Sequence, residues 1–319
     1  MAENKSRIKY LINIIRVLLL ALTFVFIFYK IFYAYHISEL ISGFRWELTT
    51  RKCIILLAVP ILTCLNWFCE SLKWKLLISK KEEFSSRDAI KAVLSGVALG
   101  IITPNQLGDF AGRVMHLKKY SKLKGSLITV IGHSAQMMMT IASGMAALLL
   151  ISKSQNWIGK EEFNILFIIF IFLIIIAFFL YIHLGKLGNY ISFKKLKPYL
   201  NTLKLYSRAE LIRVLFLALI RYCIFLTQYY LLLCFFDVQL DFLQSLSCIS
   251  ATLFAQSFVP SFLLLDLGMR GASAIWFFGM YSGQYVNVLL SAYSLWGVNI
   301  LIPGLIGWIF ILRLKLINP

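Results

Sequence analysis

The sequence predicts an all-α polytopic membrane protein, with about six spanning helices and two broken, re-entrant helical hairpins. Of its 319 residues, 60% are hydrophobic and 14% are charged, and the mean hydropathy is +0.81. Soluble domains typically carry about 25% charged residues. Several runs approach or exceed the ~20 apolar residues that cross a bilayer as a helix. The sequence argues against a β-barrel, because the strands of a barrel alternate in polarity, whereas 166–180 is apolar on every face.

Six long apolar runs are the expected spanning helices, at 11–34, 53–72, 126–152, 163–184, 211–235 and 286–313. The first run is too long for the apolar part of a signal peptide, and no small-residue cleavage site follows it. We therefore expect it to remain as the first span.

Two further apolar runs, 89–103 and 243–259, are short, and each ends at a proline, Pro104 or Pro260. Proline ends a helix, and the residue before it avoids the helical conformation. A second short helical piece follows each break, at 108–118 and 268–282. Non-helical backbone at membrane depth is tolerated only inside protein or along a wet cavity. We therefore expect two re-entrant helical hairpins.

The distribution of positive charge predicts the orientation. The net charge is +18, and most cations fall into a few groups, at 5–9, 73–91, 118–124, 186–208 and 313–315. All of these groups lie on one side if both hairpins return to the side from which they enter. The positive-inside rule makes that side, with both termini, cytoplasmic. Membrane topology therefore explains the charge, and no nucleic-acid partner is expected.

The resulting architecture is a single transmembrane domain, 1–319, without a soluble domain. Its two half-repeats, approximately 11–152 and 163–313, are inverted, so the first hairpin enters from the cytoplasm and the second from outside. Inverted repeats with broken helices that meet near the midplane are a common transporter layout. The expected location is a bacterial inner (plasma) membrane.

The first hairpin carries charges in an apolar sequence, where they are expensive. Asp109 and Arg113 are four residues apart and share a helix face. Gly112 lies between them and allows close approach of backbone or ligand. Gly108 with Asp109 is expected to open the second half-helix, whose amides would then face the break. A helix N-terminus with a nearby arginine favours an anion.

The second hairpin repeats this pattern with Asp266, Gly268, Arg270 and Gly271. Two interpretations remain open. Each Asp-x-x-x-Arg is a local ion pair that tolerates burial by neutralising itself, or the arginines bind an anionic headgroup, since arginine binds phosphate through two parallel hydrogen bonds. Both hold if the aspartate positions an arginine that keeps free donors.

Weaker candidates lie in the spans. Glu70 has Lys73 as a plausible neighbour, Arg221 shares a helix face with Gln228, and His116 follows Arg113. The expected substrate-binding residues are Pro104, Gly108, Asp109, Gly112, Arg113, Pro260, Asp266, Gly268 and Arg270, with Glu70, His116 and Arg221 as secondary candidates.

His133 and Gln136 are expected to satisfy each other or the backbone. Neither a P-loop nor a HExxH motif occurs in the sequence. No catalytic residue, metal ion or cofactor is therefore expected.

At the two hairpins the chain resembles the transmembrane region of lysylphosphatidylglycerol synthases, a flippase-like family. In the first half, that family shows a proline, a leucine–glycine–glutamate and an arginine. Here these places hold Pro104, Leu107, Gly108, Asp109 and Arg113, with aspartate for glutamate.

In its second half the family shows a proline and then a turn ending glycine–x–arginine–glutamate. Pro260, Gly268 and Arg270 match that pattern. Gly271 replaces the glutamate, and Asp266 stands where a glycine is common.

The resemblance implies movement of phospholipids or other lipid-linked anions between leaflets. Synthase members carry an added aminoacyltransferase domain, which we expect to be absent here because the sequence stops at Pro319. Two alternatives stay open: a membrane-embedded headgroup or glycosyl transferase with an acid such as Glu70, and a non-transporting subunit that presents lipid to a partner enzyme. Membrane lipids with anionic headgroups are the expected partners in the first case.

Overall fold

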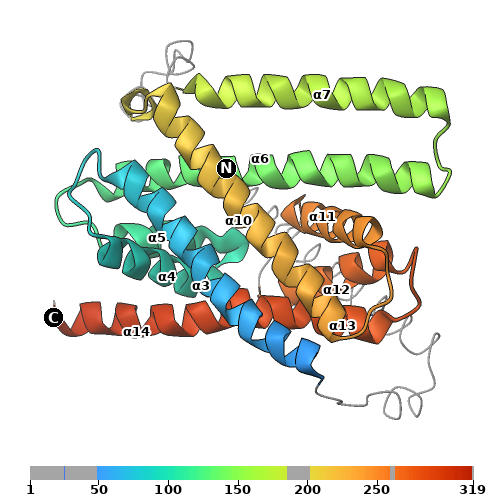
Figure 1. Ribbon diagram of the computed structural model, residues 1–319. Helices are drawn as coiled ribbons and strands as arrows, with labels where there is room; N and C mark the ends of the chain where they lie inside the picture. The colour runs from blue at the N-terminus through green and yellow to red at the C-terminus, as the bar shows by residue number, and fades with distance from the viewer. Residues whose placement is uncertain (1–24, 26–48, 185–201, 259–262, 318–319) are drawn as a thin grey trace, which may run out of the picture.

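The computed structural model describes residue 25 and residues 49–184, 202–258 and 263–317, and within these ranges the chain is helical with short connections (Figure 1). Of the expected first span, 11–34, only residue 25 is described. Pro260 also lies outside the described residues. The helices, in chain order, are α3 (Thr50–Ile78), α4 (Ser86–Ile102), α5 (Leu107–Val114), α6 (Lys122–Ser154), α7 (Lys160–Ile182), α10 (Arg208–Phe235), α11 (Phe242–Phe258), α12 (Leu263–Phe278), α13 (Tyr285–Trp296) and α14 (Ile302–Ile317).

Four helices in the described ranges are long and apolar enough to cross a membrane: Thr50–Ile78, Lys122–Ser154, Lys160–Ile182 and Tyr285–Leu314. They contain four of the six expected spans, 53–72, 126–152, 163–184 and 286–313, almost completely. The last one joins α13 to α14 through a π-helical turn, Gly297–Leu301. The expected span 211–235 forms α10, a helix of 28 residues. The prediction of an all-helical integral membrane protein is therefore confirmed.

The first hairpin breaks where the sequence predicts. Helix α4 ends at Ile102, and Asn105 and Gln106 have φ angles of 53° and 55°. Such left-handed backbone is uncommon for residues other than glycine, and here it reverses the chain. The hydroxyl of Thr103 donates to the Leu99 carbonyl at 2.9 Å and accepts the Gly108 amide at 2.6 Å. Thr103 thereby holds both sides of the break together.

Glycines let α5 lie directly on α4. A Cβ atom on Gly108 would stand 2.1 Å from the Leu99 carbonyl oxygen, and one on Gly112 would stand 2.3 Å from that of Ser95. Small residues at such positions allow the backbones of membrane helices to approach closely. Gly112 therefore allows the backbone of α5 to approach the backbone of α4 closely, which is one of the two roles predicted for it.

The second hairpin differs from its prediction. Helix α12 begins at Leu263, five residues before the expected start at 268, and ends at Phe278. Leucine is a strong helix former, and the three leucines 263–265 extend the helix on the N-terminal side of Gly268. Asp266 therefore lies in the first turn, whereas Gly268 lies inside the helix. In the first hairpin, α5 also ends early, at Val114 instead of 118.

Helices α3 and α10 pack together and cross the centre of the molecule, between the two hairpins (Figure 1). The α4–α5 hairpin lies near one end, against α14, and α11 packs on α6 near the other. The order of helix, hairpin and helix thus occurs twice. The placement in a membrane, the inverted repeat and the cytoplasmic termini stay predictions.

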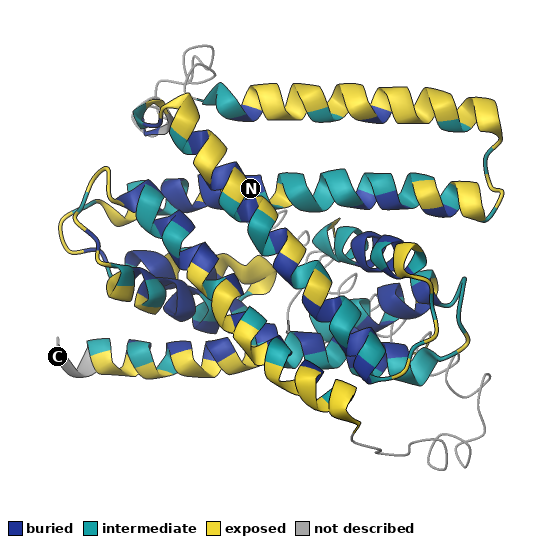
Figure 2. Ribbon diagram, viewed as in Figure 1, coloured by how far each residue is buried: buried dark blue, intermediate teal, exposed yellow. Residues whose placement is uncertain are grey.

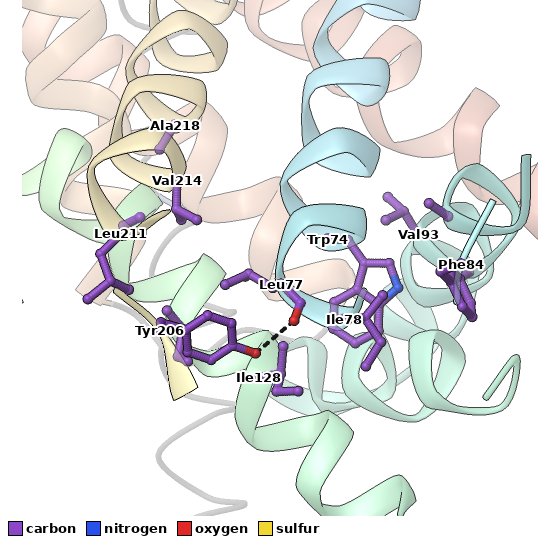
Figure 3. Packing of buried hydrophobic residues seen from close by; sticks show 14 of the residues in the cluster. Trp74, Leu77, Ile78, Phe84, Val93, Ile128, Tyr206, Leu211, Val214 and Ala218 are labelled. Atoms are coloured by element: carbon purple, nitrogen blue, oxygen red, sulfur yellow. Dashed lines mark hydrogen bonds between the residues drawn. The ribbon is translucent and has the colours of Figure 1, made fainter. Parts of the chain in front are cut away.

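Two apolar cores hold α3 and α10 together. One core contains Trp74, Leu77 and Ile78 of α3 and Leu211 of α10, and Figure 3 shows this cluster with the Tyr206 hydroxyl donating to the Leu77 carbonyl at 2.8 Å. The other core joins the opposite ends of the two helices to α11, α12 and α13.

Helix α7 contributes little to either core. Among its 23 residues, only Phe170 and Tyr181 are buried, although the helix is strongly apolar (Figure 2). Exposed apolar side chains on a long helix are the expected surface towards lipid.

Replacement of Gly112 by alanine should destabilise the fold by about 1–3 kcal/mol, because overpacking against a fixed backbone costs that much. The measurement is the thermal unfolding midpoint of the purified protein in detergent. Gly283→Ala is the matched control, since a Cβ there meets nothing within 4 Å. Equal midpoints for the two variants would contradict the close packing of α4 and α5.

Cysteine labelling tests the predicted topology. In a variant without the six native cysteines, Ser121→Cys should react with an impermeant reagent only from the cytoplasmic side. Gly283→Cys should react only from the opposite side. Ser121 directly precedes α6, and Gly283 lies between α12 and α13. Reaction of both residues from one side would exclude the inverted repeat.

Candidate functional site

A single carboxylate, that of Glu70, binds three cations in the centre of the molecule. Its Oε1 accepts a hydrogen bond from Arg113 Nη1 at 2.8 Å. Its Oε2 lies 2.6 Å from Lys73 Nζ and 2.8 Å from Arg221 Nη1. Glu70 is 2% exposed. This one side chain therefore joins α3 to α5 and to α10.

Asp109 holds Arg113 from the other side. Both carboxylate oxygens accept from Arg113 Nε, at 3.0 and 2.9 Å. Asp109 Oδ2 also lies 2.7 Å from His133 Nε2 on α6. An ionised carboxylate has no proton to donate, so the imidazole nitrogen is the donor. The expected Asp109–Arg113 pair is present, and it belongs to a larger network.

Arg221 connects this network to the second half of the chain. Its Nε donates to Asn66 Oδ1 at 2.9 Å, and its guanidinium lies 5.0 Å from the centre of the Trp67 ring. Asn66 Nδ2 and Trp67 Nε1 each donate to Asn299 at 3.0 Å, to its side-chain and backbone oxygens respectively. Asn299 lies in the π-helical turn, a feature that often occurs at functional sites.

The charges of this network do not balance. Among the described residues, three cations (Lys73, Arg113 and Arg221) share two carboxylates (Glu70 and Asp109). One positive charge is left over when His133 is neutral, and two are left over when it is protonated. Buried charge is costly unless it is paired. The network therefore favours an added anion.

A cavity of about 250 Å³ adjoins this network. Arg113, Arg221 and His133 line it, and so does Asp266 of α12. Its remaining lining residues are Trp67, Val97, Gly100, Ile101, Thr103, Gln106, Asp109, Gln136, Phe225, Trp296, Asn299 and Ile300. Side chains from both hairpins therefore meet at one cavity.

A family model for the lysylphosphatidylglycerol synthase transmembrane region matches residues 13–307. The chain belongs to this family. No match to the chain was found among curated proteins or among solved structures.

In this family member the second ion pair is simpler than the first. Arg270 Nε donates to Asp266 Oδ2 at 2.8 Å, and Nη1 donates to Gln256 at 3.3 Å. Asp266 lines the cavity, whereas the arginines that do so are Arg113 and Arg221. A direct part for Arg270 in binding stays a prediction.

The remaining predicted residues have other surroundings. His116 Nε2 lies 2.8 Å from Ser95 Oγ and does not line the cavity. Pro104 is exposed at the break, and Gly268 is buried within α12. Arg221 and Gln228 do not pair, because Gln228 donates to the Val59 carbonyl and to Thr63.

Sequence reasoning assigned His133 and Gln136 to each other or to the backbone. Their contacts are instead with Asp109 and, at 3.5 Å, with Arg221. A signal for this face was present, because two polar residues three apart in an apolar span lie on one side of the helix. In the described part of the chain, no group of three or more His, Cys, Asp and Glu is placed to hold a metal ion.

Replacement of Glu70 by glutamine should destabilise the protein by about 3–5 kcal/mol, because the buried Lys73 and Arg113 and the partly buried Arg221 lose a common counter-charge. The thermal unfolding midpoint in detergent measures this loss. The exposed Glu83, beyond the end of α3, provides the control Glu83→Gln. If the midpoints of the two variants coincide, the central role of Glu70 is wrong.

Proposed function

We propose that the protein moves a phospholipid or another lipid-linked anion between the leaflets of a membrane, a bacterial inner membrane in the expected case. Membership of the family indicates a membrane lipid-related function. The observation that carries the finer proposal is the unbalanced positive charge beside a cavity formed by both hairpins.

The two arginines at the cavity keep donors for a ligand. The hydrogen bonds of Arg113 and Arg221 to other described residues use Nε and Nη1. Within these ranges, each Nη2 is therefore without a protein partner. Guanidinium groups bind phosphate oxygens through such parallel donors. Glu70 and Asp109 hold the two groups in place, so little ordering is needed when an anionic headgroup arrives.

The arrangement also supports movement. Broken helices that meet at a central site are the elements that alternate exposure in inverted-repeat transporters. Here α5 follows the break at 103–106, and α5 and α12 each contribute an aspartate to the cavity. Movement of one hairpin relative to the other would open the cavity to one side at a time.

A transferase that uses Glu70 as its acid is less well supported. The Glu70 carboxylate is bound to three cations, and the residue does not line the cavity. A subunit that only presents lipid to a partner enzyme would share the same cavity, and the transport assay below distinguishes it.

Arg221→Gln should slow the flipping of a fluorescent phosphatidylglycerol in reconstituted vesicles by about tenfold or more, the loss expected for a charge-assisted hydrogen bond. Chemical quenching of the outer-leaflet fluorophore measures the rate. Arg113→Ala combined with Arg270→Ala should also slow it.

The control is Arg213→Gln, an exposed arginine two turns earlier on α10. It should flip lipid at the parent rate at matched insertion. Parent-like flipping by both arginine-deficient proteins, or absence of flipping by the parent protein, would refute translocation through this cavity.

A further inference from the structure

A groove of about 480 Å³ runs along α6, next to the charged cavity. Its lining is mostly apolar and includes the exposed side chains of Val130 and Met137. The full lining is Phe110, Val130, His133, Ser134, Gln136, Met137, Met138, Thr140 and Ile141.

Two side chains belong to both spaces, since His133 and Gln136 line the groove and also the cavity. His133 binds Asp109 at 2.7 Å, and its ring centre lies 5.5 Å from that of Phe110. Gln136 lies 3.5 Å from Arg221. The boundary between the charged cavity and the apolar groove is therefore only one layer of side chains thick.

The dimensions and chemistry of the groove fit a hydrocarbon chain. Val130 and Ile141 are eleven positions apart on the helix, which corresponds to about 16 Å along its axis. Methionine side chains adapt to irregular apolar ligands, and Met137 and Met138 lie in the middle of this stretch. An amphipathic molecule could place an anionic headgroup in the cavity and a hydrocarbon chain in the groove at the same time.

We propose that the groove on α6 holds an acyl chain of the lipid whose headgroup occupies the cavity, and that His133 and Gln136 form the passage between them. This inference rests on the proposed function, and it assigns to α6 the lateral route by which a lipid enters. The acyl chain stays in the groove while the lipid headgroup crosses the layer formed by His133 and Gln136.

The first experiment uses a phosphatidylglycerol with a photoreactive diazirine in the acyl chain, reconstituted with the full-length protein in phosphatidylcholine vesicles. Cross-links mapped by mass spectrometry should concentrate on 130–141 and exceed those on α7, although α7 is the more apolar helix. Arg221→Gln should reduce the cross-links on 130–141 by about tenfold, since the head no longer anchors the chain. Equal labelling of α6 and α7, or labelling independent of Arg221, would show ordinary surrounding lipid and overturn the inference.

The second experiment fills the groove. Met137→Trp should slow the flipping of a long-chain phosphatidylglycerol by about tenfold, as expected when a bulky side chain overfills a fitted space. A short-chain phosphatidylglycerol should be affected less. Leu150→Trp is the control, because Leu150 is similarly exposed, at 41% against 39%, on the same helix outside the groove. Equal effects of the two substitutions would overturn the inference.

The two proposals fail separately. Groove labelling that depends on Arg221, without flipping by the parent protein, would retain the acyl-chain site and exclude translocation. Flipping that depends on Arg221 but not on Met137→Trp would retain translocation and exclude the groove. Cross-linking of the groove to a second protein chain in place of lipid would also exclude it.

Discussion

The arrangement of the molecule depends on the ionic contacts of Glu70. This carboxylate binds Lys73 within α3, Arg113 of α5 and Arg221 of α10. Bringing so many charges out of water is expensive, and only close contacts with good geometry offset the expense. The relative placement of three helices is thereby linked to one side chain, and the cavity lies where those helices meet.

The glycines of the first hairpin make sense in relation to this network. Arg113 reaches Glu70 because α5 lies directly on α4, and Gly108 and Gly112 permit that approach. On the facing helix, a Cβ at Gly96 would stand 2.3 Å from Asp109 Oδ1. The absence of a side chain at Gly96 makes room for the aspartate that holds Arg113. Close packing of α5 on α4 and the ionic contacts of Arg113 therefore both require glycine at these positions of the hairpin.

Contacts within a helix or hairpin could be predicted from the sequence, whereas contacts between distant helices could not. Asp109–Arg113, Asp266–Arg270 and Glu70–Lys73 follow from helical spacing, and the break at Pro104 follows from proline chemistry. Arg221 lies 151 residues from Glu70, and periodicity does not reveal which helix faces meet. The π-helical turn at Asn299 has no simple sequence signal. Helix α12 starts earlier than predicted because the predicted start at Gly268 did not take the helix-forming leucines 263–265 into account.

The two hairpins contribute unequally to the cavity, and this asymmetry bears on the proposed transport. The side chains of Asp109 and Arg113 are 8% and 5% exposed and belong to a network with surplus positive charge. Those of Asp266 and Arg270 are 18% and 11% exposed and form a neutral pair. A ligand in transit must bind well enough to enter and weakly enough to leave. We infer that one positive wall facing one neutral wall meets this requirement better than two positive walls, which would hold an anionic headgroup too tightly for release.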